Sequence, residues 1–97
     1  MMKVTVEYLG YIKQILGTAQ GESVELKDNA LVRDLLGLLA EKHGEAFRKA
    51  IYEPNGLDLK PHYIASVNGL LLNQLSGLET KLKDGDRVIL MPVVTGG

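Results

Sequence analysis

The chain has 97 residues and a formal net charge of −1, which fits a single domain and argues against nucleic acid as its main partner, because proteins that bind phosphate backbones usually carry a clear basic excess. Apolar residues make up 45% of the chain and charged residues 24%, close to globular averages, so disorder, a collagen-like repeat and a coiled coil are excluded for the whole chain. The absence of cysteine excludes disulfides, thiolate metal sites and a cysteine nucleophile.

Two strand-like patterns and a short helical turn open the chain. Residues 3–9 alternate in polarity, with every second residue apolar from Val4 to Tyr8, which predicts a half-buried strand. A helical turn ended by Gly17 and a second strand over 22–26 are expected next. The residues that we expect to point inward from the turn are Ile12, Ile15 and Leu16.

An amphipathic helix is the clearest element of the sequence. Its apolar residues recur at i, i+3, i+4 and i+7, and they are Val32, Leu35, Leu36 and Leu39. Leu31 and Leu38 widen the apolar stripe. We expect Asp28 or Asn29 to cap the start of this helix and Gly44 to end it.

The second half of the chain predicts a shorter helix over 45–52 and then three strands. These strands are expected over 63–67, 70–72 and 87–91. Asn68-Gly69 favours a tight hairpin between the first two, and Asp84-Gly85-Asp86 favours a turn before the last. The order of elements predicts an α+β protein with one main helix on a mixed sheet of about five strands.

Few residues could support independent catalysis. His43 and His62 lack the spacing of metal ligands, and Asp84 and Asp86 fit a turn better than an acid–base pair. We therefore expect no bound metal or cofactor and no autonomous enzyme. No segment has the apolar core of a signal peptide or the roughly 18 apolar residues of a membrane span, so we expect a cytoplasmic protein with no membrane partner.

The C-terminal residues form a distinctive tail. Pro92 cannot donate to a strand ladder, so the sequence divides into a domain over 1–91 and a tail over 92–97. Val93, Val94 and Thr95 favour an extended chain, and six extended residues reach about 20 Å. Gly96 and Gly97 have no side chains, so the tail could enter a narrow slot and present only its carboxylate. The alternative is a frayed end without a function.

Three consecutive leucines predict a docking surface. One helix can cover only one face of the sheet, so some of Leu70, Leu71 and Leu72 are expected to be exposed, together with Met91 and Val93. The alternative is that a loop covers them.

Taken together, these features resemble the MoaD/ThiS family of ubiquitin-like sulfur carriers, whose fold is the β-grasp. The resemblance runs nearly end to end, and its last part is the diglycine end. The segments that carry it are 3–8, 32–36, 67–69, 82–88 and 92–97. Residues 47–61 are similar to the longer archaeal members and to the carrier of an alternative cysteine biosynthesis route.

The resemblance implies a carrier that acts with partner enzymes. An E1-like enzyme would adenylate the Gly97 carboxylate with ATP, and a sulfur donor would then leave a thiocarboxylate on Gly97. Gly96 would provide clearance and residues 92–95 would be the guided tail. The sulfur is expected to be used in molybdopterin biosynthesis, with the large subunit of molybdopterin synthase as the partner.

Other uses stay open at this point. The same thiocarboxylate could supply sulfur for thiamine, cysteine or tRNA thiolation, and an activated Gly97 could instead form an isopeptide bond to lysines of other proteins. A more distant alternative is an interaction module that binds through 70–72 and has an inert tail. An RNA-binding module is disfavoured by the net charge of −1 and by the five aromatic residues, one Phe and four Tyr.

Overall fold

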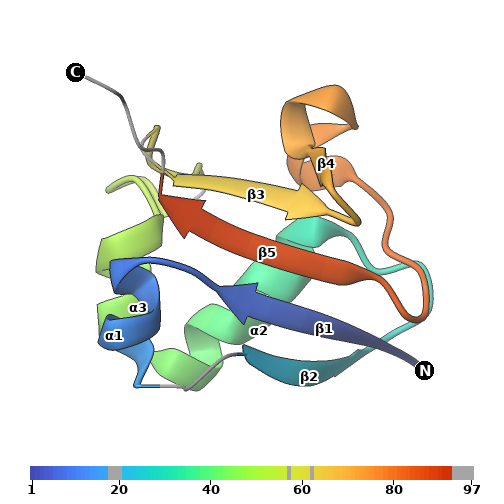
Figure 1. Ribbon diagram of the computed structural model, residues 1–97, viewed down its shortest axis with the longest axis horizontal. Helices are drawn as coiled ribbons and strands as arrows, with labels where there is room; N and C mark the ends of the chain where they lie inside the picture. Colours follow the sequence, from blue (N-terminus) through green and yellow to red (C-terminus); the bar gives the residue numbers. More distant parts are fainter. Residues whose placement is uncertain (18–20, 57, 62, 93–97) are drawn as a thin grey trace.

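A five-stranded mixed sheet forms the centre of the protein in the computed structural model, which describes residues 1–17, 21–56, 58–61 and 63–92 (Figure 1). The strands are β1 (Met2–Tyr8), β2 (Gly21–Leu26), β3 (Tyr63–Val67), β4 (Leu70–Leu71) and β5 (Arg87–Pro92). Their order in the sheet is β2-β1-β5-β3-β4. The first and last strands lie side by side and are parallel, whereas the other neighbours are antiparallel.

Among the described residues, three α-helices and two short 3-10 helices connect these strands along the chain. They are α1 (Tyr11–Leu16), α2 (Val32–His43) and α3 (Glu45–Ile51), with short 3-10 helices η1 (Leu72–Gln74) and η2 (Gly77–Glu79). Figure 1 shows α2 crossing behind the sheet. This arrangement confirms the predicted α+β class and is the β-grasp fold. No helix in the described part of the chain is long and apolar enough to cross a membrane.

The core lies between α2 and one face of the sheet. Alternation places Val4, Val6 and Tyr8 of β1 on that face, and all three are buried as predicted. The four stripe residues of α2 are fully buried against them, because a period of 3.6 residues keeps such positions on one side of a helix. Phe47 and Ile51 of α3 complete this core.

Three expectations for the helices are wrong. The N-cap of α2 is Leu31, not Asp28 or Asn29. Residues 30–32 are instead held by backbone hydrogen bonds with 80–82, and the Asp34 carboxylate accepts the N–H of Leu31 at 2.8 Å. Tertiary pairing therefore sets where this helix begins.

Two side chains that were expected to face inward are exposed. Ile15 is 42% exposed because α1 has only six residues and buries only Ile12 fully, while Leu16 packs partly against the core. Leu38 is 40% exposed, at the outer edge of the α2 stripe.

Both predicted turns are confirmed. Asn68 and Gly69 have φ angles of 51° and 87°, the pairing that a two-residue hairpin of the right twist requires. In the turn before β5, Asp84 accepts the N–H of Lys3 and Asp86 accepts the N–H of Lys83, both at 2.8 Å. These carboxylates are therefore occupied by backbone donors.

A polar cluster joins β1, β2 and the end of α2. The Glu22 carboxylate accepts hydrogen bonds from Tyr8 Oη at 2.7 Å and from Lys42 Nζ, and one of its oxygens lies 2.7 Å from His43 Nε2. The Glu22 side chain is only 11% exposed. Burial alone would raise the pKa of Glu22, but the three hydrogen bonds outweigh burial and lower it. Burial of Tyr8 and its hydrogen bond to Glu22 raise the pKa of Tyr8.

Candidate functional site

The predicted site divides between described and undescribed residues. Residues 93–97, which include Gly96 and Gly97, lie outside the described part, as does His62. Met91 and Pro92 lie at the end of β5, which is one residue longer than predicted because Pro92 still pairs with Tyr63. The division into a domain and a tail stays a prediction.

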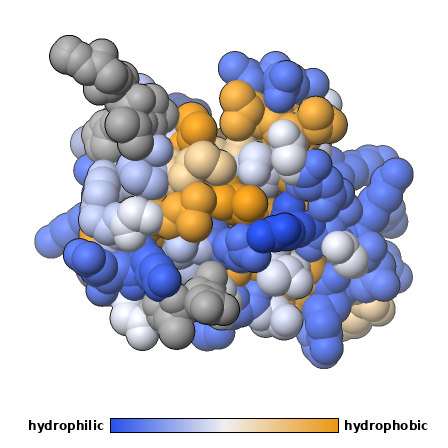
Figure 2. All heavy atoms as spheres, viewed as in Figure 1, coloured by the Kyte–Doolittle hydropathy of each residue, from blue (hydrophilic) through white to orange (hydrophobic). Residues whose placement is uncertain are grey.

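An open sheet face leads to this end of β5. The register places Ile64 opposite Met91, and Ser66 opposite both Ile89 and Leu71. These side chains point away from α2, since the residues between them belong to the core. Figure 2 shows hydrophobic residues gathered over β3, β5 and β4 on this side. We call the hydrophobic residues Ile64, Leu71, Ile89 and Met91 the open-face patch.

The three leucines do not act together. Leu71 is 36% exposed and belongs to the open-face patch, whereas Leu70 is 48% exposed and lies opposite Val67, at the edge of the sheet. Leu72 begins η1 and packs against the core. Alternation along β4 points Leu70 and Leu71 to opposite faces of the sheet. The chain then turns into η1, which packs Leu72 against the core. The prediction that some of these leucines are exposed is confirmed for Leu70 and Leu71, whereas Leu72 is partly buried.

One ion pair borders the open-face patch. Arg87 Nη2 lies 2.7 Å from a carboxylate oxygen of Glu7, and the register places these residues on the same face as Ile89. The Arg87 side chain is 58% exposed, so the pair contributes little to stability. It does give the patch a polar margin on the side of β1.

The base of the predicted tail is held between two elements. On one side Gly10, in the turn between β1 and α1, approaches the Pro92 ring. On the other side Tyr63 is the register partner of Pro92, and its ring packs against Tyr11 with centroids 5.6 Å apart. Burial, and next a hydrogen bond with Tyr11, raise the pKa of Tyr63. We call Gly10, Tyr11, Tyr63 and Pro92 the tail base.

Two of these features were missed from the sequence. The polar cluster at Glu22 joins residues far apart in the chain, and no local pattern indicates it. Gly10 left a weak signal, since a glycine between a strand and a short helix marks a special backbone position.

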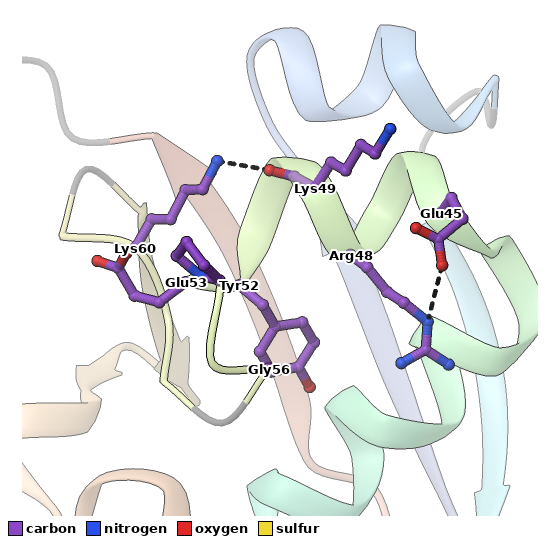
Figure 3. Close-up of a pocket in the computed structure, with 8 residues that line it drawn as sticks. Glu45, Arg48, Lys49, Tyr52, Glu53, Gly56 and Lys60 are labelled. Carbon is purple, nitrogen blue, oxygen red and sulfur yellow. Dashed lines mark hydrogen bonds and ion pairs between the residues drawn. The ribbon is translucent and has the colours of Figure 1, made fainter.

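A pocket on the helix side does not compete with this region as a site. It has a volume of about 420 Å³ and lies between α3 and the loop that follows it (Figure 3). Figure 3 shows Arg48 turned toward Glu45, at 3.9 Å, and Lys60 donating to the backbone oxygen of Lys49. Arg48 and Glu45 therefore form an ion pair, and Lys60 is bonded to the backbone. Within the described residues, no group of three His, Cys, Asp or Glu side chains could hold a metal ion.

Comparisons with known proteins agree with this architecture. The protein is 30% identical to a solved structure from Pyrococcus furiosus described as a candidate molybdopterin converting factor, subunit 1, with a TM-score of 0.75 over 97% of this chain and 100% of that one. It is 28% identical to the small archaeal modifier protein 1 of Methanosarcina acetivorans, with a TM-score of 0.77 over 100% of this chain and 98% of that one. A protein of Archaeoglobus fulgidus, described as a candidate sulfur carrier, is 33% identical over 80% of this chain and 86% of its own length.

The fold and these relatives define a ubiquitin-like protein of the class that comprises sulfur carriers and protein modifiers. The ThiS family model matches residues 6–97. The chain therefore belongs to the ThiS family, as its resemblance predicted.

Proposed function

We propose that this chain carries sulfur as a thiocarboxylate on Gly97 and delivers it for molybdopterin biosynthesis. The observation that carries the proposal is the family match, which extends through the diglycine end to Gly97. The 30% identity to the Pyrococcus furiosus protein supports molybdopterin as the destination. The chain itself holds no catalytic group in this scheme, because the partner enzymes supply the chemistry.

The chemistry requires an activated carboxyl group. A carboxylate oxygen of Gly97 attacks the α-phosphorus of ATP, a P–O bond to pyrophosphate breaks, and an acyl adenylate forms. Hydrosulfide then attacks the carbonyl carbon, AMP leaves, one proton is released and a thiocarboxylate remains. If the donor is a persulfide, the product is an acyl disulfide, and a thiol must reduce its S–S bond to release the same thiocarboxylate.

The described structure supports two parts of this scheme. The open-face patch gives a partner enzyme an apolar surface with a polar margin, an arrangement typical of protein interfaces. The patch reaches Met91, next to the residue from which the tail leaves. A partner bound there would therefore have the tail beside its own surface.

Alkylation and mass spectrometry test the proposal. The protein is isolated from cells that co-express the adenylating enzyme of its source organism and is treated with iodoacetamide at near-neutral pH. Because the chain has no cysteine, a thiocarboxylate is its one strongly nucleophilic sulfur group. The adduct is expected on the C-terminal peptide. An unmodified C-terminal peptide, with the activating enzyme and ATP shown to be competent, would refute the proposal.

A second function has its own support. The 28% identity to a small archaeal modifier protein favours conjugation of the activated Gly97 to lysines. That use predicts peptides in which residues from this C-terminus are linked to lysine ε-nitrogens of other proteins. Transfer of sulfur from the thiocarboxylate to a molybdopterin precursor by the large synthase subunit tests the first use directly. Transfer for thiamine, cysteine or tRNA thiolation would show another sulfur acceptor.

A further inference from the structure

The turn after β1 touches the residue from which the tail leaves. Directly after β1, the N–H of Leu9 donates to the oxygen of Leu90 in β5, at 3.0 Å. Pro92 has no N–H and cannot extend this ladder, and β1 turns away at Gly10. The backbone segments that follow β1 and β5 therefore separate at the same place.

Gly10 allows an unusually close approach at this point. A Cβ atom on residue 10 would lie 2.7 Å from Pro92 Cγ and 3.0 Å from Pro92 Cδ. Carbon atoms in contact lie about 3.5–4.0 Å apart, so any side chain on residue 10 would have to displace the Pro92 ring. Tyr63 borders Pro92 from β3, which restricts where the ring could move.

The direction of the backbone at Pro92 matters because a small rotation there would cause a larger displacement at the end of the tail. A fully extended segment of five residues spans about 17 Å, and for such a segment a rotation of about 10° at its base moves the tip by about 3 Å. A misplacement of about 1 Å can already cost a reaction about a hundredfold in rate. The direction of residue 92 could therefore decide whether Gly97 reaches the reacting phosphate.

We propose that Gly10 is a positioning residue for activation: because it has no side chain, the β1–α1 turn closes onto the Pro92 ring and sets the direction in which residues 93–97 leave the domain. This inference rests on the proposed function, since the direction of the tail matters only if the tail is delivered into a partner.

Gly44 provides a matched control. Gly10 has φ 66° and ψ −147°, and Gly44 has φ 78° and ψ −152°. Each glycine directly precedes a helix, and each has a backbone conformation that alanine adopts only with strain. A Cβ on Gly44, however, would meet no atom within 4 Å. Gly10→Ala and Gly44→Ala therefore add similar backbone strain, and only the first also adds a clash with Pro92.

The activity test measures pyrophosphate release by the adenylating enzyme of the source organism, with each full-length variant as its substrate. Gly10→Ala is expected to lower the thermal midpoint at least as far as Gly44→Ala, because it adds a clash with Pro92 to a similar backbone strain. Gly10→Ala is expected to lower kcat at least tenfold with KM within twofold, because the open-face patch is unchanged. Gly44→Ala is expected to keep both within twofold. Equal kinetics for the two variants, with wild-type protein active, would overturn the inference and leave the proposed function standing.

A double variant tests the contact itself. Alanine at 92 lacks Cγ and Cδ, so Gly10→Ala/Pro92→Ala is expected to have the kcat of Pro92→Ala alone. Independent, multiplied losses would overturn the inference. If Gly10→Ala does not fold, Pro92→Ala opens the same contact without strain at residue 10, and a wild-type kcat for Pro92→Ala would also overturn it.

A spectroscopic readout separates the inference from the proposed function. Residual dipolar couplings of the Val93 and Val94 amides report their direction without any enzyme. These couplings are expected to change in Gly10→Ala and to stay at wild-type values in Gly44→Ala. Unchanged couplings in Gly10→Ala would overturn the inference, whereas changed couplings with an inactive wild-type protein would refute only the proposed function.

Discussion

Glu22 shows how a single residue can connect three elements. Its carboxylate on β2 meets Tyr8 of β1 and the last two residues of α2, Lys42 and His43. The His43 ring in turn stacks on Phe47 of α3, with centroids 6.0 Å apart. A charge this little exposed is tolerated because each carboxylate oxygen has a partner. The cluster fixes the end of α2 against the sheet.

Glu22→Gln should lower stability in a pH-dependent way. The variant is expected to lose about 1–3 kcal/mol of unfolding free energy at pH 7, since it weakens hydrogen bonds to a charged group. The folded protein lowers the pKa of Glu22, so the stabilisation is complete above the unfolded value, about 4.3, and is lost as the pH falls through the folded value. Urea unfolding followed by circular dichroism between pH 3 and pH 7 should show the two stabilities converging in acid.

Glu25→Gln is the control for this prediction. Glu25 lies on the same strand with an exposed side chain. Its substitution is expected to change the unfolding free energy by less than about 0.5 kcal/mol. Parallel pH curves for wild type and Glu22→Gln down to pH 3 would contradict the role assigned to the carboxylate.

Gly96→Ala tests the chemistry at the end of the chain. A methyl group at this position should block entry into a slot shaped for glycine, so adenylation and thiocarboxylate formation are expected to be abolished. The described core contains no residue after Leu90, so the thermal midpoint is expected to stay unchanged. Calorimetry and the alkylation assay check both parts, and thiocarboxylate formation at the wild-type rate would rule out the slot.

At the scale of elements, the β3–β4 hairpin is tied to the turn before β5. Asn68 donates from Nδ2 to Asp86 at 2.8 Å, and its Oδ1 accepts the N–H of Arg87 at 2.9 Å. The same residue has the positive φ that the hairpin needs. One asparagine thus links two turns that are adjacent in space but far apart in sequence.

Asn68→Ala should therefore cost more than a turn substitution alone. Asn29 is the matched control, because its φ is 69° and the structure describes no hydrogen bond of its exposed side chain. Alanine at either position is expected to cost about 1–2 kcal/mol for the left-handed backbone. Asn68→Ala should lose a further 1–3 kcal/mol or so from its side-chain bonds. Equal losses in urea unfolding would show that these bonds do not stabilise the protein.

Local sequence signals predicted most elements. They failed where contacts between residues far apart in the sequence determine the structure. The stripe of α2, the alternation of β1 and the Asn68-Gly69 turn each depend on neighbours in the chain, and the structure confirms all three. The start of α2 was predicted too early because pairing with 80–82 holds Leu31 extended, directly before the helix. Such pairing leaves no local pattern.

At the scale of the whole molecule, the two faces of the sheet have different roles. The face toward α2 holds the core, and the other holds the open-face patch beside the tail base. Sequence reasoning predicted that one face would be open and that leucines of the 70–72 segment would lie there. It could not assign each leucine, because a shift of one residue in register reverses the direction of every side chain in a strand. It also could not predict the contact between Gly10 and Pro92, which exists only once β1 and β5 lie side by side.

Leu71→Asp tests whether the open-face patch docks the activating enzyme. A carboxylate there should oppose burial against a partner, so the KM for adenylation is expected to rise about tenfold or more, which corresponds to about 1.4 kcal/mol of binding free energy. Because Leu71 is partly exposed in a two-residue strand, unfolding free energy should change by no more than about 1 kcal/mol. Leu38→Asp is the matched control, since Leu38 has similar exposure but lies on α2, away from the open face. If the two variants have equal KM values, the partner binds elsewhere. A raised KM for Leu71→Asp alone, beside a reduced kcat for Gly10→Ala, would separate the surface that binds the enzyme from the turn that directs the tail.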